Sequence, residues 1–282
     1  EPSDTFLGKL KQDCLRYLVA NHLLKPCTDT YNTILSSYGL PTTKKFVFDT
    51  FFQEPDLVLQ SGTPGFEFNR PDLSPTIRFV GPMLPYSQGV QHPFRQIKLT
   101  RQYKHVVLVT QGTVERNPEK IIVPTLEAFK DDDQTLVIAT TGGSQTQALQ
   151  ARYPQANLVI EDFIDFNRVM PYAHVYVTNA GYGGVMLALQ NGLPIVAAGV
   201  HEGKNEIAAR IGYFKVGISL KTENPTATQI RQSVGRILND KQYKRNAEQL
   251  GAEFRQYNTN QLCEKYIAEL LEQSASYVMA VS

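Results

Sequence analysis

The sequence predicts an α/β fold built on a parallel sheet, and two observations carry this prediction. From residue 105 onward, short apolar runs alternate with segments whose apolar residues recur at helical spacing. Strands that alternate with helices are typical of a parallel sheet covered by helices on both faces. The chain of 282 residues is 42% hydrophobic and 20% charged, so it has ordinary globular composition and enough bulk for a sizeable core.

The elements of this half follow in order from their patterns. Apolar runs predict strands at residues 105–110, 135–139, 158–160, 174–178, 194–198 and 217–220. Helical spacing predicts helices at residues 118–129, 167–173, 185–190, 205–211, 228–239, 243–251 and 261–273.

The first hundred residues have a different pattern. Residues 6–37 have helical spacing with scattered basic residues, which predicts a helix packed on its own domain; a helix lying on a membrane surface is the alternative. β-rich runs at 46–48, 57–59 and 77–80 are separated by turns that contain proline and glycine. Residues 85–100 have no strong periodicity and are interpreted as a linker.

Charge and cysteine content exclude several classes. The 28 Lys and Arg against 27 Asp and Glu leave no basic surplus, so nucleic acid is not expected as a partner. Three scattered cysteines without a CxxC pair argue against a zinc site or a disulfide framework and fit a cytoplasmic location. The apolar runs are far shorter than the ~20 residues that a bilayer-spanning helix needs. The polar start at Glu1, without a methionine, suggests a processed or truncated chain.

Ligands of parallel sheets bind at the carboxyl ends of the strands, so the loops there are the candidate sites. The loop at 178–184 follows a strand, opens a helix and contains four candidate phosphate-binding residues, namely Asn179, Gly181, Gly183 and Gly184. Glycines allow close backbone approach, and the first helical turn offers N–H groups to a phosphate. A tight turn with glycines for packing alone is the alternative. The fingerprint GxGxxG fails at Met186, which argues against NAD.

Three further loops carry candidate groups. Thr113, after the first strand of the sheet, has a hydroxyl suited to a phosphate, although a turn-capping role is the alternative; Gly142 follows the second strand. Phe163 is expected to stack on a base while the Ile164 backbone reads the edge of that base; a core aromatic is the alternative.

A fifth loop, which is polar, follows the strand at 194–198. Glu202, Lys204 and Asn205 carry groups that hydrogen-bond sugar hydroxyls, whereas a solvated loop with Asn205 as N-cap is the alternative. Groups suited to a base, a diphosphate and a sugar thus converge on one edge of the predicted sheet.

From residue 105 to about 220 the chain resembles the C-terminal domain of UDP-dependent glycosyltransferases of the GT-B fold, the bacterial antibiotic and plant secondary-metabolite type. The matching stretches are Phe163-Ile164-Asp165, the segment Thr178 to Gly184, Gly192-Leu193-Pro194 and Gly203-Lys204. The departures from the family pattern are Asn179 for a His that contacts the diphosphate, Gly184 for Ser or Thr, Leu187 for a ribose-binding Glu, and Gly203-Lys204 for the acid–amide pair of the sugar, with Glu202 one place earlier.

The resemblance also implies a domain organisation. Residues 97–282 correspond to a complete Rossmann-like nucleotide-sugar domain, and residues 1–96 to part of an acceptor-side domain, on which the helix at 261–273 is implied to pack. The early His that serves the family as general base has no counterpart among His22, His92, His105, His174 and His201. The catalytic residues are therefore unassigned, and this chain alone is expected to lack the base.

The expected activity is transfer of a sugar from a UDP- or TDP-sugar to an acceptor hydroxyl of a small molecule or lipid, with no cofactor or metal. Three alternatives stay open. The chain is a non-catalytic binder of nucleotide sugar, it is one part of a split transferase completed by a separate segment or chain, or it is an epimerase of the same fold.

Overall fold

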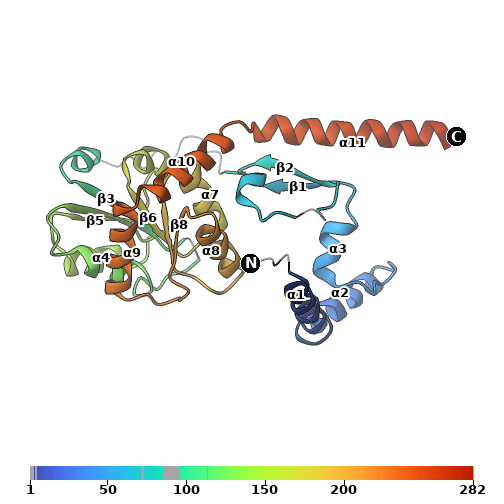
Figure 1. The fold of residues 1–282 in the computed structure, drawn as a ribbon, viewed down its shortest axis with the longest axis horizontal. Coiled ribbons are helices and arrows are strands. Elements are labelled where there is room, and N and C mark those ends of the chain that lie inside the picture. The colour runs from blue at the N-terminus through green and yellow to red at the C-terminus, as the bar shows by residue number, and fades with distance from the viewer. Residues whose placement is uncertain (1–2, 4, 71–72, 85–95, 113, 282) are drawn as a thin grey trace. The chain divides into compact units, whose positions relative to one another are not determined.

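The computed structural model describes residues 3, 5–70, 73–84, 96–112 and 114–281, with side chains up to residue 273. The chain divides into two compact units (Figure 1). The first comprises residues 1–64, 68–80 and 258–282, and the second comprises residues 65–67 and 81–257. The predicted boundary between two domains, at residues 96 and 97, stays a prediction.

The second unit is built on a six-stranded sheet in which every neighbouring pair is parallel. Its strands are β3 (His105–Thr110), β4 (Thr135–Thr140), β5 (Leu158–Glu161), β6 (Val175–Thr178), β7 (Ile195–Ala197) and β8 (Gly217–Ser219). Their order across the sheet is β5-β4-β3-β6-β7-β8. All six predicted strands are present within one or two residues of their expected bounds.

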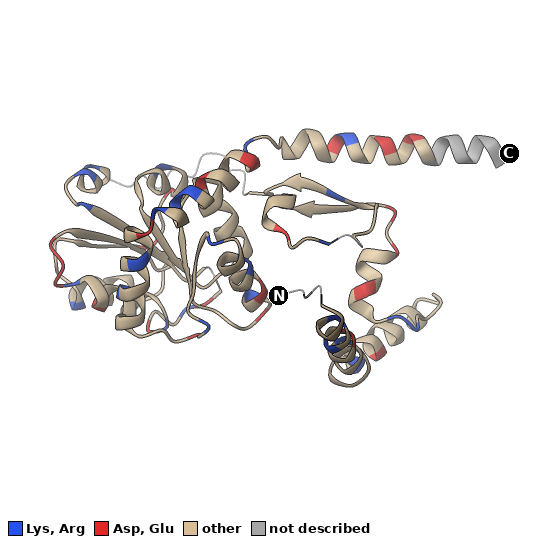
Figure 2. Cartoon of the chain, in the orientation of Figure 1, with Lys and Arg blue, Asp and Glu red and all other residues tan. Residues whose placement is uncertain are grey.

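Side-chain alternation along β3 shows how the sheet is covered on both faces. Val106 and Leu108 belong to one buried cluster, whereas Val107 and Val109 belong to another. Successive side chains of a strand point to opposite faces, so each face has its own apolar layer. Apart from Glu161 at the end of β5, the charged residues in the described part of this unit lie on helices and loops, and the strands are almost entirely tan in Figure 2.

The helices of this unit cover the two faces (Figure 1). They are α4 (Ile122–Phe129), α5 (Thr146–Arg152), α6 (Phe166–Val169), α7 (Tyr182–Gln190), α8 (Lys204–Tyr213), α9 (Ala227–Asn239) and α10 (Lys241–Phe254), with short 3-10 helices at Ile97–Arg101 and Met170–Tyr172. Helices α4 and α9 pack on one face with Leu126 and Val234, and α7 and α10 pack on the other with Leu189 and Leu250.

Helix α5 is absent from the sequence prediction. Its seven residues bury only Thr146 and Leu149, so no apolar stripe marks it. By contrast, α9 begins where a capping box predicts a start, because Thr226 and Gln229 bond each other's backbone N–H groups.

The first unit contains α1 (Phe6–Leu18), a π-helical segment (Val19–Leu23), α2 (Lys25–Ser37) and α3 (Val47–Gln53). It also contains β1 (Val58–Ser61) and β2 (Ile77–Gly81), which form a two-stranded sheet, and α11 (Thr259–Val281). In the part of the chain that the structure describes, no helix is both long enough and apolar enough to cross a membrane.

One predicted strand of this unit is wrong. Residues 46–48 lie at the start of α3, in which Val47 and Thr50 are the buried positions. That three-residue spacing is helical, whereas the prediction rested on a run of three apolar residues, which periodicity alone cannot assign. Of the predicted linker, residues 85–95 lie outside the described residues, and Ile97–Arg101 form a 3-10 helix.

Candidate functional site

The strand order of the six-stranded sheet defines where a ligand can enter. Strands β3 and β6 are neighbours, yet the chain leaves β3 toward β4 and β5 on one side and continues from β6 toward β7 and β8 on the other. The carboxyl edge between β3 and β6 is therefore the topological switch point of the sheet, which is the usual ligand site of such sheets. The candidate loops named from the sequence follow β3, β4, β5, β6 and β7 at this edge.

Asn179 joins the two loops at this switch point. Its side-chain Nδ2 donates to the carbonyl of Gln111 at 2.5 Å, and its Oδ1 accepts from the backbone N–H of Gly181 at 3.2 Å. Residue 180, which follows, has a φ of 62°. The amide is therefore engaged by protein on both of its polar atoms, and its observed contacts hold the loops after β3 and β6 together.

Helix α7 begins beside this bridge. Gly181 is its N-cap and has no side-chain cap, so the first turn relies on other acceptors for its N–H groups. A Cβ at Gly183 would meet nothing within 4 Å, whereas a Cβ at Gly184 would lie 3.0 Å from the Tyr176 hydroxyl. Gly183 is thus open on its outer side, whereas a side chain at position 184 would contact the Tyr176 hydroxyl tightly.

Tyr176 explains the departure at Gly184. The ring is fully buried under α7, and burial raises the pKa of its hydroxyl to about 12, while a hydrogen bond with Thr178 acts in the opposite direction. The hydroxyl therefore stays protonated at neutral pH and occupies the space beside the backbone of residue 184.

The loops after β3 and β4 lie next to each other. Gly112 and Gly142 both have positive φ, 81° and 65°, and a Cβ on Gly142 would lie 3.7 Å from the Gly112 carbonyl. The N–H of Gly142 donates to the carbonyl of Asp162 at 2.9 Å, which ties the β4 loop to the β5 loop. Thr113, the predicted phosphate ligand, lies outside the described residues.

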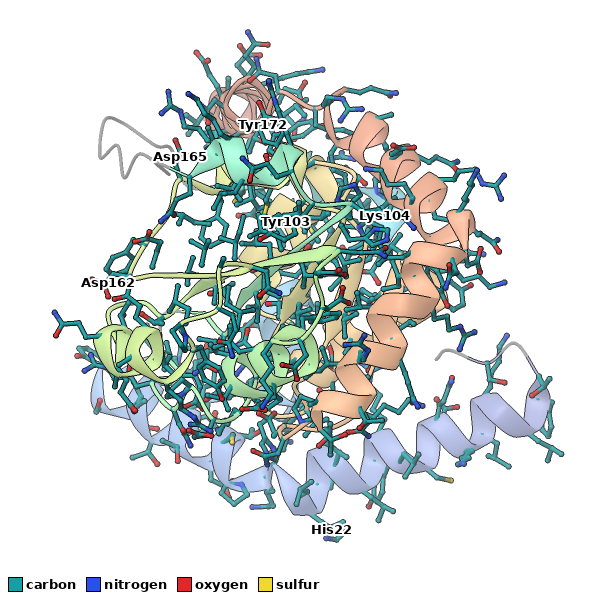
Figure 3. All side chains as sticks on the ribbon, turned by 90° about the vertical axis from the view of Figure 1, so that its left-hand side faces the viewer. His22, Tyr103, Lys104, Asp162, Asp165 and Tyr172 are labelled. Atoms are coloured by element: carbon teal, nitrogen blue, oxygen red, sulfur yellow. The ribbon has the colours of Figure 1, made fainter. Side chains whose placement is uncertain are left out.

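Phe163 lies in the loop after β5, between Asp162 and Asp165, which are labelled in Figure 3. Its side chain is 51% exposed, so the alternative of a core aromatic is wrong. A Cβ on Gly143 would lie 3.8 Å from the Phe163 ring, which places the ring against the glycine turn of the β4 loop. Ile164, the next residue, is buried.

Two charged residues of the polar loop after β7 form an ion pair. Lys204 Nζ lies 2.7 Å from the Glu202 carboxylate; the lysine side chain is 18% exposed and the glutamate 71%. Asn205 is exposed in the first turn of α8, but Gly203 is the N-cap of this helix, so the alternative that Asn205 caps it is wrong. A Cβ at Gly199 would lie 2.3 Å from the Asn179 carbonyl, so this loop presses directly on the β6 loop.

Sequence reasoning missed two parts of this edge. Glu223, after β8, accepts the N–H groups of Val200 and His201 at 2.6 and 2.9 Å. Applying the rule of carboxyl-end loops to β8 as well would have found it. The second part is a hydrogen-bonded chain from Thr141 through Thr146 to the Asp162 carboxylate, which depends on the missed helix α5.

Other titratable groups near the sheet lie outside the candidate loops. Among the described residues, no group of three or more His, Cys, Asp or Glu is placed to hold a metal ion. His105 and His174 stack edge to face at 5.9 Å at the amino ends of β3 and β6. Burial is the main cause that lowers the pKa of each. Figure 3 shows Lys104, just before β3, well away from Asp162.

The strand order, with its switch point between β3 and β6, defines a doubly wound α/β domain. Residues 124–270, a little over half of the chain, match the family described as erythromycin biosynthesis protein CIII-like, C-terminal domain, and the chain belongs to this family. The matched segment contains β4 to β8 and every candidate site residue except Thr113.

Among the curated relatives, one is named a synthase and another a glucosyltransferase. The chain is 33% identical over 253 residues to 4'-demethylrebeccamycin synthase of Lentzea aerocolonigenes, covering 90% of this chain and 59% of that protein. It is 36% identical over 208 residues to UDP-glucosyltransferase 1 of Beauveria bassiana, covering 73% and 45%. The chain thus spans about half the length of these relatives.

The solved structure of CalG4, the calicheamicin glycosyltransferase, superposes on 98% of this chain and 68% of its own, with a TM-score of 0.70 and 19% identity. This likeness shows the fold, which is that of GT-B glycosyltransferases. The sequence prediction of that fold and family is confirmed.

Proposed function

We propose that this chain binds a nucleoside diphosphate sugar at the carboxyl edge of its six-stranded sheet and takes part in transfer of the sugar to an acceptor hydroxyl. The observation that carries the proposal is the Asn179 bridge, which holds the β3 and β6 loops together beside the first turn of α7. The N–H groups in the first turn of a helix suit a diphosphate. The names of the relatives support a UDP-sugar.

Each loop has a place in the proposed complex. The first turn of α7, with Gly181, Gly183 and Gly184, would take the diphosphate, together with Thr113. The exposed ring of Phe163 offers a flat surface to the base, with the Ile164 backbone beside it. Gly142 supports the same region, and Glu202, Lys204 and Asn205 would hydrogen-bond the sugar.

In the transfer step, the bond between the sugar carbon and the diphosphate oxygen breaks while a bond to the acceptor oxygen forms. A base removes the acceptor proton, and the diphosphate leaves with its negative charge. The helix dipole and the N–H groups of α7 stabilise that charge without a metal ion. Activity is therefore expected to survive treatment with a chelator such as EDTA.

The acceptor and the base belong to the whole protein. The relatives are longer than this chain, which supports a base and an acceptor surface supplied by further residues or by another chain. A small molecule or lipid with a free hydroxyl is the proposed acceptor. The three free cysteines support a reducing, cytoplasmic setting.

Calorimetric titration with UDP, TDP and GDP tests the donor site. We expect saturable binding of UDP, weakened at least tenfold by Asn179→Ala and also by Thr113→Ala. Absence of binding by all three nucleotides would refute the proposal. If the chain binds UDP but the whole protein does not consume UDP-glucose when acceptors are supplied, the alternative of a non-catalytic binder is favoured.

A further inference from the structure

We infer that Glu223 is a positioning residue for the donor sugar: its carboxylate holds the loop between β7 and α8 in the shape that presents Glu202 and Lys204. The inference rests on the proposed function, because it assumes that a nucleotide sugar occupies this edge. Glu223 lies on the connection after β8, and its partners lie 22 and 23 residues earlier in the chain.

The contact is specific in its geometry. A single oxygen, Oε1 of Glu223, accepts the N–H of Val200 at 2.6 Å and the N–H of His201 at 2.9 Å. Two successive backbone N–H groups that converge on one anion form a concave anion-binding turn. Hydrogen bonds to a charged acceptor are about twice as strong as neutral ones, so this contact restrains the loop more than an ordinary turn bond does.

The loop needs such a restraint. Between the end of β7 and the start of α8, Glu202 and Gly203 both have positive φ, 55° and 78°. For Glu202 this conformation is unfavourable and persists only where surrounding contacts impose it. Gly199 presses on the Asn179 carbonyl at one end of the loop, and Glu223 holds the middle of it.

The charges around Glu223 keep it in the required form. Burial by itself would raise the pKa of Glu223, but the N–H groups of Val200 and His201, with the nearby charges of His201 and Lys204, lower that pKa overall. Lys120 also faces Glu223 and Glu202, although its main partner is Glu115. The carboxylate is therefore ionised at neutral pH and accepts both N–H groups.

Neighbouring loops therefore have different proposed roles in binding the nucleotide sugar. Asn179 and α7 shape the part proposed for the diphosphate, whereas the loop held by Glu223 carries the groups proposed for the sugar. Loss of Glu223 should therefore weaken contacts to the sugar and leave those to the nucleoside diphosphate intact. A role in general stability would instead affect both ligands equally.

Titration of the full chain with UDP and with UDP-glucose separates these outcomes. For Glu223→Ala we expect affinity for UDP-glucose to fall at least tenfold while affinity for UDP changes less than twofold. Glu223→Gln should retain part of the UDP-glucose affinity, because its amide oxygen can still accept both N–H groups. Glu248→Gln is the matched control, since Glu248 is exposed on α10 and pairs with Lys244.

Amide hydrogen exchange without ligand supplies an independent readout. The amides of Val200 and His201 should exchange at least tenfold faster in Glu223→Ala than in the parent, and at the parent rate in Glu248→Gln. Unchanged exchange, or equal losses for UDP and UDP-glucose, would overturn the inference. If the parent chain binds neither ligand, the proposed function fails, and the inference falls with it even where the exchange rates change.

Discussion

At the scale of single residues, Asn179 shows how a departure from a family pattern is accommodated. At the position where the resembled pattern has a His, this chain uses both polar atoms of an amide to connect Gln111 and Gly181. An amide can donate from one atom and accept on the other, which a charged side chain of similar size cannot do. The observed role of this residue is therefore to fix the relative position of the loops after β3 and β6.

Asn179→Asp tests this reading with almost no change in size. The new carboxylate retains the bond from Gly181 but faces the Gln111 carbonyl with an oxygen, so we expect a loss of about 1–3 kcal/mol in unfolding free energy. It also places a negative charge beside the proposed diphosphate, and UDP affinity should fall more than tenfold. Chemical denaturation and calorimetry measure the two effects.

Asn205→Asp is the control for that substitution. Asn205 is exposed in the first turn of α8, where a negative charge is tolerated or favoured. Its unfolding free energy and UDP affinity should stay close to those of the parent. Equal behaviour of the two Asp variants would show that the bridge contributes nothing.

Gly184 gives a second prediction at this scale. Gly184→Ser puts a Cβ 3.0 Å from the buried Tyr176 hydroxyl, and overpacking of this kind costs about 1–3 kcal/mol. Removing that hydroxyl with Tyr176→Phe in the same chain should recover most of the loss. Thermal denaturation of the single and double variants measures it, and no recovery would mean that the strain has another origin.

At the scale of elements, the packing of α10 on α7 depends on a close approach of two backbones. A Cβ at Gly251 in α10 would lie 2.7 Å from the Leu189 carbonyl of α7. Gly251→Ala must therefore push the helices apart, and we expect a loss of about 1–3 kcal/mol in unfolding free energy by chemical denaturation.

Gly235→Ala, in the middle of α9, is the opposite case. Nothing lies within 4 Å of the position of its Cβ, so only helix propensity changes, and we expect a gain of about 0.5–1 kcal/mol. Equal losses of unfolding free energy in both variants would contradict the assignment of the Gly251→Ala loss to the contact between α10 and α7.

At the scale of the whole molecule, a short segment from the N-terminal part of the sequence belongs to the second unit. Phe66 is 3% exposed in the core of that unit, with its ring 5.5 Å from the ring of Phe214. Glu67 pairs with Arg210 at 2.8 Å, and the N–H of Gly65 donates to Glu253 at 2.9 Å. This segment therefore contributes to folding of the second unit, although the long continuous part of that unit begins only at residue 81.

Phe66→Ala should destabilise the second unit by about 3–5 kcal/mol, the usual cost of deleting a buried aromatic ring. Chemical denaturation followed by far-UV circular dichroism measures this loss. Phe163→Ala removes a ring of the same size from an exposed loop, and its unfolding free energy should stay within about 0.5 kcal/mol of the parent value. A small effect of Phe66→Ala would mean that the second unit folds without residues 65–67.

The sequence predicted most of the sheet and less of the short helices. Strands such as β3 are runs of buried residues, and that signal is local and strong. Helix α5 and the start of α3 are short and bury only two residues each, so their patterns are too brief to separate helix from strand or loop. The exposure of Phe163 was likewise not predictable, because its ring lies against the glycine turn of the β4 loop, about 20 residues earlier in the chain.

The sequence by itself determined the class of the second unit, the strands that compose it and the loops that follow them. This was possible because the alternation of short apolar runs with segments of helical spacing is a local property of the sequence. Tertiary structure alone decided which loops meet. Gln111 and Asn179 are 68 residues apart, and Glu223 lies 23 residues from Val200. Such pairs form because strands of a sheet bond sideways to partners that no local pattern specifies, and that pairing brings the separate loops to one edge.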